Sequence, residues 1–452
     1  MTESAPRQER RRFSATETHP ALPTLGGVHL PLEARAIDVL RSRSFLVFLG
    51  STVATTAGLW LFETTLYWTA LSSTGSADAT GLILTALIVP VLLFIIPMGV
   101  VTDRWGDRRL LLLSQLGWLV MMVAAVLIAH AGRLTFSVAV ILALTDGVID
   151  AVWVVPAQVL LARLVDRPLM AKAIAYGTLQ VAFGRIIGGY GAGRVLSSAG
   201  PAATFALGAT CIFIGLVLMA FLRPKHSFAD RRAHSGLLDG FRFATSHAPV
   251  LALYTMGSSI ALFLYGYLSI LPVVSRNLLH AGPDGLGLMT GAGGVGTLVA
   301  VWVIDPVGRR FGRGTSLVAS AAVAALAMVV LGVSRSQLLS AVAASAITGS
   351  LMFYSATNTT LLQSLAPPDL RGRVLSFFGL AFWAMMPVSG LGAGYLADRF
   401  GVSPALVAMG LAAGVGLVAI KVFYRPLSEL DVADDGSFVM RGQRALVTEA
   451  RV

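Results

Sequence analysis

Charged residues are scarce in this chain. Asp, Glu, Lys and Arg together make up 13% of its 452 residues, whereas they make up about a quarter of a soluble protein. Apolar residues account for 56% of the chain, and the mean hydropathy is +0.77. This composition excludes an ordinary soluble protein and indicates a polytopic membrane protein.

Cysteine is almost absent, and the common catalytic motifs are missing. The one cysteine, Cys211, lies inside an apolar run and has no second cysteine with which to form an internal disulfide. No P-loop, H-E-x-x-H sequence or cysteine cluster is present, which argues against ATP-driven transport and metalloprotease chemistry. We therefore expect no enzymatic activity, no metal site and no bound cofactor.

A signal peptide is not visible either, because the first apolar run begins only near Ser44. The residues before it are polar and include Arg10-Arg11-Arg12. We expect residues 1–43 to form a cytoplasmic N-terminal arm that is mostly disordered, with a short amphipathic piece (Leu32 to Leu40) at the membrane surface.

Twelve apolar runs follow, each close to the length of about 20 residues that crosses a bilayer as a helix. An even number of spans places both termini on the same side of the membrane. The predicted spans are 44–72, 79–102, 109–130, 134–162, 170–197, 202–222, 250–275, 283–304, 315–333, 338–365, 373–397 and 403–424.

Lys and Arg are distributed unequally between the loops. Loops after the even-numbered spans, up to the tenth, carry 16 of them, and loops after the odd-numbered spans carry five. Because basic residues accumulate in cytoplasmic loops, both termini are predicted to be cytoplasmic in a multi-pass protein of the inner (plasma) membrane. The net charge of +11 then follows from topology, and we expect no nucleic-acid partner.

The longest internal loop, residues 223–249, divides the spans six and six. The predicted domains are therefore an N-terminal half (44–222), a C-terminal half (250–424) and a cytoplasmic tail (425–452). Within the linker, residues 236–245 mix apolar and polar side chains at helical spacing, which predicts an amphipathic helix along the cytoplasmic surface.

An internal repeat supports the same division. The pattern Asp103-x-x-Gly106-x-Arg108 recurs 202 residues later as Asp305-x-x-Gly308-x-Arg310. Many transporters consist of two such repeated halves, with the substrate site at the midplane between them.

The first copy of this pattern lies in a charged turn between the second and third spans, Gly99 to Arg109. Asp103 is expected at the C-terminal end of a helix, where the helix dipole disfavours an anion. It therefore needs cationic neighbours, and Arg104, Arg108 and Arg109 are within reach.

This turn resembles the loop 2–3 signature of the major facilitator superfamily, G-x-x-x-D-R-x-G-R-[KR]. Five residues match it, and Asp107 stands where the family prefers a basic residue; the matching residues are Gly99, Asp103, Arg104, Gly106 and Arg108. The resemblance implies a charge latch that favours one of two membrane-facing states, repeated in loop 8–9 at Asp305, Gly308 and Arg310. The alternative is a basic loop that only fixes topology.

Motifs nearer the C-terminus resemble the macrolide-efflux and enterobactin-exporter branch of that superfamily. They are Asn358-Thr-Thr-Leu-Leu-Gln363, Pro367-Pro-Asp-Leu-Arg371-Gly372-Arg373-Val and Gly390-Leu-Gly-Ala-Gly394. The resemblance covers residues 40–425. It implies an all-α fold of twelve transmembrane helices in two pseudo-symmetric six-helix halves, and secondary active export by alternating access.

Glycines in the fifth span occupy the place of the family's G-P-x-x-G-G exporter motif, with Gly189 in place of the proline. Glycines allow helices to approach closely. The predicted packing residues are Gly184, Gly188, Gly189 and Gly193.

Four ionisable residues are predicted to lie within the bilayer: Glu63 in the first span, Asp146 and Asp150 in the fourth, and Arg185 in the fifth. A charge at this depth costs about 2.5–3.5 kcal/mol on insertion scales and is usually functional. Our hypothesis is that Asp150, with Asp146 or Glu63, takes up and releases a proton while Arg185 holds the deprotonated form. The alternative is a static pair that stabilises a helix contact.

Aromatic and polar residues in several spans are candidates for the wall of a substrate cavity. A largely apolar cavity with few polar groups suits a bulky amphipathic molecule. The candidates are Trp60, Trp153, Tyr265, Tyr354, Asn358, Gln363 and Trp383.

The sequence thus predicts proton-coupled efflux of a drug-like or amphipathic small molecule by a monomer in the lipid bilayer, with the proton gradient as energy source. A siderophore or secondary-metabolite exporter is the first alternative, and uptake is a second. A membrane sensor or assembly protein that transports nothing is the alternative from another class.

Overall fold

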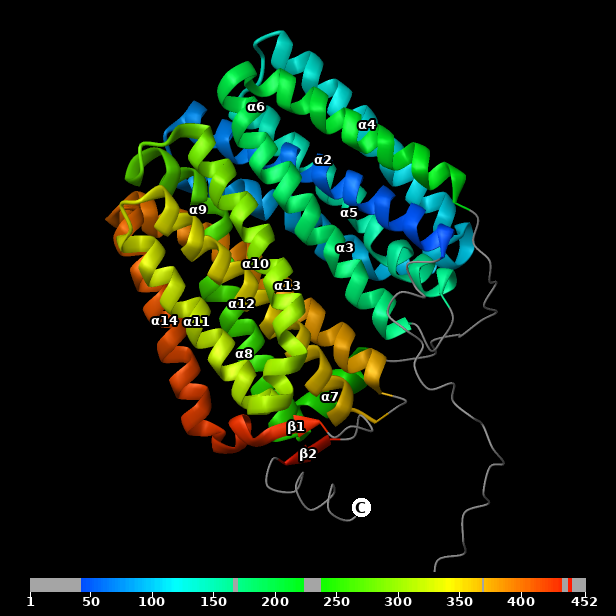
Figure 1. The fold of residues 1–452 in the computed structure, drawn as a ribbon, viewed down its shortest axis with the longest axis vertical. Helices are drawn as coiled ribbons and strands as arrows, with labels where there is room; N and C mark the ends of the chain where they lie inside the picture. The colour runs from blue at the N-terminus through cyan, green and yellow to red at the C-terminus, as the bar shows by residue number, and fades with distance from the viewer. Residues whose placement is uncertain (1–41, 166–169, 223–236, 368–369, 433–437, 441–452) are drawn as a thin grey trace, which may run out of the picture. The chain divides into compact units, whose positions relative to one another are not determined.

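A computed structural model describes residues 42–165, 170–222, 237–367, 370–432 and 438–440. These residues are almost entirely helical (Figure 1). The predicted N-terminal arm, apart from its last two residues, and linker residues 223–236 lie outside this part of the chain.

The first half contains α2 (Arg43–Thr74), α3 (Ala77–Trp105), α4 (Asp107–His130), α5 (Phe136–Leu164) and α6 (Met170–Phe221). A ten-residue helix, α7 (Leu237–Ser246), precedes the second half. The second half contains α8 (Ala248–Leu264), α9 (Tyr267–Val273), a π-helical turn (Val274–Leu278), α10 (Gly282–Phe311), α11 (Arg313–Val333), α12 (Gln337–Leu365), α13 (Arg371–Phe400) and α14 (Val402–Phe423).

Eleven helical segments in the described ranges are long and apolar enough to cross a membrane. One of them, α6, has 52 residues and is broken at Gly200, which has φ 78° and precedes Pro201. An unbroken helix of that length would measure about 78 Å, far more than the roughly 30 Å of a bilayer's hydrocarbon core. Each arm of α6 is therefore one crossing, which gives the twelve crossings that the sequence predicts.

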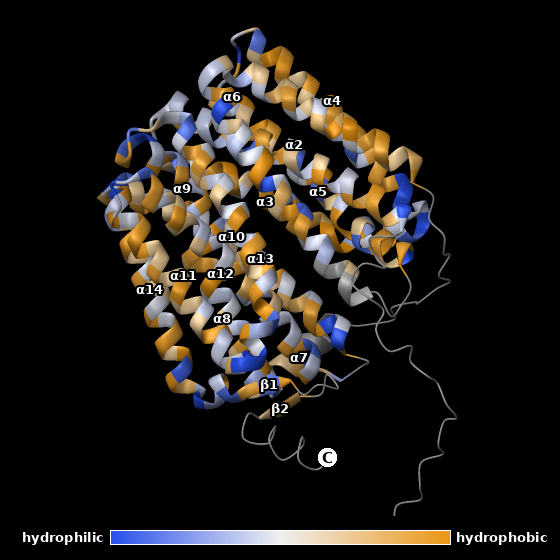
Figure 2. Ribbon diagram, viewed as in Figure 1, coloured by the Kyte–Doolittle hydropathy of each residue, from blue (hydrophilic) through white to orange (hydrophobic). Residues whose placement is uncertain are grey.

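The outer surfaces of these helices are apolar. Large hydrophobic side chains such as Val120, Leu127, Leu326 and Val415 are more than half exposed. Hydrophobic colouring runs along α4, which carries the first two of them (Figure 2). Apolar surfaces of this kind are favourable in contact with lipid. The predicted all-α polytopic fold class is therefore confirmed.

Single glycines form the tight turns between consecutive helices. Gly106 joins α3 to α4 with φ 82°, and Gly312 joins α10 to α11 with φ 81°. Positive φ is strained for residues with a Cβ atom, so glycine suits both turns. Gly312, and not Gly308, is therefore the structural counterpart of Gly106. The predicted repeat of 202 residues is out of register here, because Gly308 lies inside the last turns of α10.

The helices pack mainly within their own half. In the first half α2 packs on α6, and α3 packs on α5; in the second half α10 and α11 pack on α12. The halves meet along two helix pairs, α6 with α10 and α3 with α13. We call the end that carries the α3–α4 and α10–α11 turns the basic end, and the end with the α2–α3 and α13–α14 turns the opposite end.

The predicted cytoplasmic tail contains structure that the sequence analysis did not assign. Arg425–Glu429 forms a 3-10 turn, and Leu430–Val432 pairs with Phe438–Met440 as an antiparallel hairpin, β1 and β2. The buried Asp431 carboxylate accepts a hydrogen bond from the backbone N–H of Arg313 (3.3 Å), so this segment covers the first turn of α11.

Candidate functional site

Three carboxylates of the first half lie close to one another inside the helix bundle. Glu63 comes from α2, and Asp146 and Asp150 lie one turn apart on α5. Glu63 is half-buried and interacts electrostatically with Asp150 and with Arg185. The four ionisable residues that the sequence singled out are therefore neighbours, although they come from three helices. We call them the charged cluster.

Asp146 is the most enclosed of these acids. It is 5% exposed, and its carboxylate accepts a hydrogen bond of 2.8 Å from the indole Nε1–H of Trp118, which is fully buried on α4. The ring of Trp118 also lies 5.4 Å from that of Trp153 on α5. Asp146 is thus tied into the seam between α4 and α5, whereas Asp150 has no hydrogen bond or ion pair to any residue that the structure describes.

Arg185 connects the two halves. Its Nε donates to the backbone carbonyl of Thr290 on α10 (3.0 Å), and its Nη2 donates to the Tyr267 hydroxyl on α9 (3.0 Å). The guanidinium carbon lies 4.5 Å from the ring centre of Trp60, an arrangement that favours a cation–π interaction. The Tyr267 hydroxyl is in turn 2.6 Å from the hydroxyl of Thr348.

These contacts differ from the hypothesis in which Arg185 holds Asp150. The described hydrogen bonds of Arg185 end on Thr290 and Tyr267, and the carboxylate with which it interacts electrostatically is that of Glu63. Sequence reasoning did not identify the partners, because a backbone carbonyl and an uncharged tyrosine on other helices leave no charge signal.

The predicted cavity residues fall into two groups. Trp60, Trp153, Tyr265 and Trp383 are half-buried, and Trp60 packs directly on Arg185. Tyr265 packs edge-on against Phe382, with ring centres 5.2 Å apart.

Tyr354 and Asn358 do not line an open cavity in this conformation, which corrects the prediction for these two, whereas the prediction for Gln363 stays a prediction. Tyr354 and Asn358 are 1% and 0% exposed, within the core of the second half, and Gln363 is exposed near the basic end of α12. The amide nitrogen of Asn358 is buried without a hydrogen-bond partner among the described residues. An unpaired buried amide costs about 1–3 kcal/mol, so this position offers a donor to any polar group that reaches it.

The predicted packing glycines of α6 lie where other helices approach closely. A Cβ atom at Gly188 would collide with the Ala57 carbonyl on α2, and one at Gly193 would lie 2.7 Å from the Gly287 Cα on α10. Gly184 faces α2, and Gly189 faces Thr290 on α10. The α6 glycines therefore allow this helix to contact its own half and the other half at once.

The opposite end is closed by contacts between the halves. The carboxylate of Asp398 on α13 accepts hydrogen bonds from the Ser76 hydroxyl (2.5 Å) and from the backbone N–H groups of Ala77 (2.8 Å) and Asp78 (2.9 Å), and so caps α3. Arg194 pairs with Asp284 at 3.0 Å. These bonds, together with those of Arg185, all lie between the middle of the bundle and the opposite end.

At the basic end, the charged turn is arranged differently from the latch that the signature implies. Asp103 and Arg104 are exposed. The buried acid is Asp107, whose carboxylate pairs with Arg163 of α5 at 3.2 Å. Arg108 donates to the Ala220 carbonyl at the end of α6 (2.7 Å) and does not contact Asp103.

The turn of the second half has a weaker pair. Asp305 lies 3.7 Å from Arg313, and its side chain is 70% exposed. Arg310 lies over the neighbouring ring of Phe311. In each of the two turns, the described contacts are with residues of the same half.

Comparison with known proteins gives a consistent picture. Residues 34–447 match the sequence profile of a family described as "Transmembrane secretion effector". The chain is 24% identical over 390 residues to the staphyloferrin A transporter of Staphylococcus aureus (strain NCTC 8325 / PS 47), covering 85% of this chain and 94% of that protein. It is also 24% identical over 378 residues to the multidrug efflux pump Tap of Mycolicibacterium fortuitum, covering 81% and 92%.

Among solved structures, the fold resembles that of a bacterial homologue of the human lysosomal transporter Spinster in an inward-facing, unoccupied conformation. The TM-score is 0.63 at 17% sequence identity, over 85% of this chain and 97% of that one.

Proposed function

Because the chain belongs to the Transmembrane secretion effector family of the major facilitator superfamily and is a membrane transporter, we propose that it exports a drug-like or amphipathic small molecule in exchange for protons. The observation that carries this proposal is the charged cluster. The half-buried Glu63 carboxylate, close to those of Asp146 and Asp150, interacts electrostatically with an arginine whose hydrogen bonds cross to the other half.

The geometry supports a simple coupling mechanism. Glu63 attracts the Arg185 guanidinium when it is ionised and loses that attraction when it binds a proton. Arg185 can then strengthen or release its bonds to Thr290 and Tyr267. Proton binding on one half would in this way change the free energy of the contact between the halves, which is what alternating access requires.

We further propose the orientation in which both termini are cytoplasmic, because the basic end carries most of the arginines of the loops. In that orientation the closed opposite end faces outward. The structure then corresponds to an inward-facing state, ready to take substrate from the cytoplasm or from the inner leaflet of the plasma membrane.

The half-buried Trp60, which packs on Arg185, supports an apolar substrate with few polar groups. The similarity to the staphyloferrin A transporter favours a second candidate, a polar siderophore-like compound. Both candidates share the same proton-coupled cycle and differ only in the compound that is carried.

The test is substrate accumulation in cells that overproduce the protein, measured for lipophilic dyes, antibiotics and siderophores with and without a protonophore. We expect lower accumulation of at least one lipophilic compound, reversed by the protonophore. Asp150→Asn and Glu63→Gln should abolish the effect, because neither amide can bind and release a proton, while the protein remains in the membrane.

Thr145→Val is the matched control, because it changes a polar residue on the outer side of the same helix as Asp150. Transport by Asp150→Asn and Glu63→Gln that still responds fully to the proton gradient would disprove the coupling role of the charged cluster. Accumulation that differs only for siderophores would favour the second candidate.

A further inference from the structure

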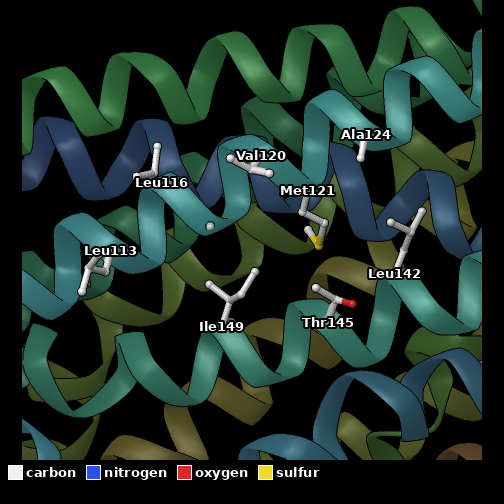
Figure 3. Close-up of a pocket in the computed structure, with 9 residues that line it drawn as sticks. Leu113, Leu116, Val120, Met121, Ala124, Leu142, Thr145 and Ile149 are labelled. Atoms are coloured by element: carbon white, nitrogen blue, oxygen red, sulfur yellow. The ribbon is translucent and has the colours of Figure 1, made fainter.

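A groove runs along the outer side of the α4–α5 pair (Figure 3), and no residue of the charged cluster lines it. Its volume is about 550 Å³. The lining includes Leu113, Leu116, Val120 and Ala124 of α4, and Thr145 and Ile149 of α5.

The lining is hydrocarbon in character. Leu116 is 47% exposed and Val120 is 63% exposed, so the groove is open on its outer side. The one hydroxyl, that of Thr145, already donates to the Ile141 carbonyl at 2.8 Å. A molecule bound in the groove therefore does not need a polar group there.

The groove is about as long as half of a bilayer's hydrocarbon core is thick. Leu113 and Ala124 are eleven residues apart on α4, which corresponds to about 16 Å along a helix. Half of a hydrocarbon core is about 15 Å thick. Leu113 lies six residues after the first residue of α4 and Ala124 six residues before the last, so the groove is centred on the helix. A single acyl chain that enters from the basic end fits its length.

A free cation stands where the groove approaches the membrane surface. Arg109 precedes Leu113 by four residues and Leu116 by seven, so all three share one face of α4. Arg109 is exposed and has no hydrogen bond or ion pair with any residue in the described ranges. Its neighbour Arg108, by contrast, is bonded to Ala220.

We propose that this groove is a binding site for one anionic phospholipid, with an acyl chain between α4 and α5 and the headgroup phosphate at Arg109. Boundary lipid covers every outer surface of a membrane protein, but a groove of acyl-chain length with a free arginine about 6 Å before its first lining residue distinguishes this site. The site lies behind the seam that Trp118 and Asp146 close, so the lipid packs against the outer side of the helices that carry the acids.

The first experiment measures lipid selectivity of the full-length protein. The purified protein is equilibrated in detergent with equal amounts of phosphatidylglycerol and phosphatidylcholine of identical chains, and retained lipids are counted by native mass spectrometry. We expect one phosphatidylglycerol to be retained about fivefold more often than phosphatidylcholine, the preference that one basic residue at a membrane surface provides.

Arg109→Gln should remove this preference, because it removes the charge but keeps the groove. Lys421→Gln is the matched control. Lys421 is an exposed cation near the basic end of α14, away from the groove, and its loss should leave the preference unchanged.

A second variant tests the groove itself. A Cβ atom at Gly117 would lie 3.5 Å from Ile149 Cδ1, an ordinary contact, so Gly117→Leu fills the groove without forcing α4 from α5. Retention of the tightly held lipid should then fall. Gly414→Leu adds the same side chain to α14, where a Cβ atom meets nothing within 4 Å, and should retain the lipid as the wild type does.

Equal retention of both lipids by the wild type would show ordinary boundary lipid and would overturn the proposal. So would a preference that survives Arg109→Gln, or retention that survives Gly117→Leu. Two further results would also overturn it by assigning the groove another occupant: displacement of the lipid by a transported compound, or a dimer that Gly117→Leu dissociates.

Discussion

Arg185 is a residue of the first half whose described hydrogen bonds both end in the second half. The side chain is 4% exposed, so its bonds to Thr290 and Tyr267 are protected from water. Hydrogen bonds to charged groups contribute about 1.5–3 kcal/mol. In a transporter whose two states differ by a few kcal/mol, one such bond is enough to shift the balance between them.

Tyr267→Phe should therefore destabilise the conformation seen here. We expect the ratio of this conformation to the alternative to fall by about 10-fold or more, which corresponds to the loss of one charge-assisted bond. Distances between spin labels at the basic ends of α3 and α10, measured by pulsed electron paramagnetic resonance, report this ratio.

Tyr254→Phe is the control for this substitution. The Tyr254 hydroxyl donates to the Val374 carbonyl, and both residues belong to the second half. Its loss should affect the stability of that half without changing the label distances. Unchanged distances in Tyr267→Phe would show that the Arg185 bond does not help to select the conformation.

The residues of the charged cluster could be predicted from the sequence, because ionisable residues are rare in apolar spans. The sequence could not locate Trp118, Thr290 or Tyr267, since their contributions depend on which helices become neighbours. The same reason explains why Tyr354 and Asn358 were wrongly predicted to line the cavity. Their helix was predicted correctly, but the face that they occupy packs into the core of the second half.

At the scale of helices, the closed end depends on how α13 caps α3. Asp398 accepts three hydrogen bonds at this cap and stands at the N-terminus of α3, where the helix dipole favours an anion. The Ser76 hydroxyl also accepts a hydrogen bond from the Asp78 N–H (3.1 Å). Asp398 is itself exposed, but its carboxylate accepts three hydrogen bonds. Arg194 and Asp284 also join the halves through a single ion pair, and their side chains are 62% and 44% exposed. Exposed ion pairs contribute about 0–1 kcal/mol.

Asp398→Ala should loosen the closed end more than Asp284→Ala. We expect Asp398→Ala to increase the labelling rate of a cysteine placed at Ser73 by about fivefold or more. This is the effect of losing charge-assisted hydrogen bonds that contribute about 1 kcal/mol or more to closing this end. Asp284→Ala should change the rate by less than that. A Cys211→Ala background removes the native thiol, and equal rates in both variants would contradict the proposed importance of the cap.

Turn geometry explains why the helices were easier to predict than the repeat. Eleven of the twelve predicted spans correspond to one helix or to one arm of α6, because long apolar runs determine where a chain can cross a bilayer. The span predicted at 250–275 corresponds to α8, α9 and the start of the π-helical turn. The repeat of Asp, Gly and Arg suggested Gly308 as a turn residue, but the backbone turns at Gly312, four residues and about one helical turn later. A short motif does not specify its own helical register.

For the whole molecule, the break at Gly200 determines the topology. If α6 crosses the membrane twice, the loop at Gly200 faces the side opposite to the α3–α4 turn. A cysteine at Ser198 should then react with a membrane-impermeant reagent in intact cells, whereas one at Asp103 should react only after the cells are permeabilised, in a Cys211→Ala background. The reverse pattern would invert the proposed orientation, and equal reactivity would contradict a double crossing.

The segment that follows α14 has a consequence for biosynthesis. Leu427 and Leu430 are fully buried, and their carbonyl groups lie against Gly314 at the start of α11. These residues follow α14 in the chain, so the start of α11 is covered only after all the helices of the second half have been synthesised. A chain that terminates early, after its last membrane crossing but before Leu427, leaves the first turn of α11 uncovered and gives cellular proteases a means of telling truncated protein from whole protein.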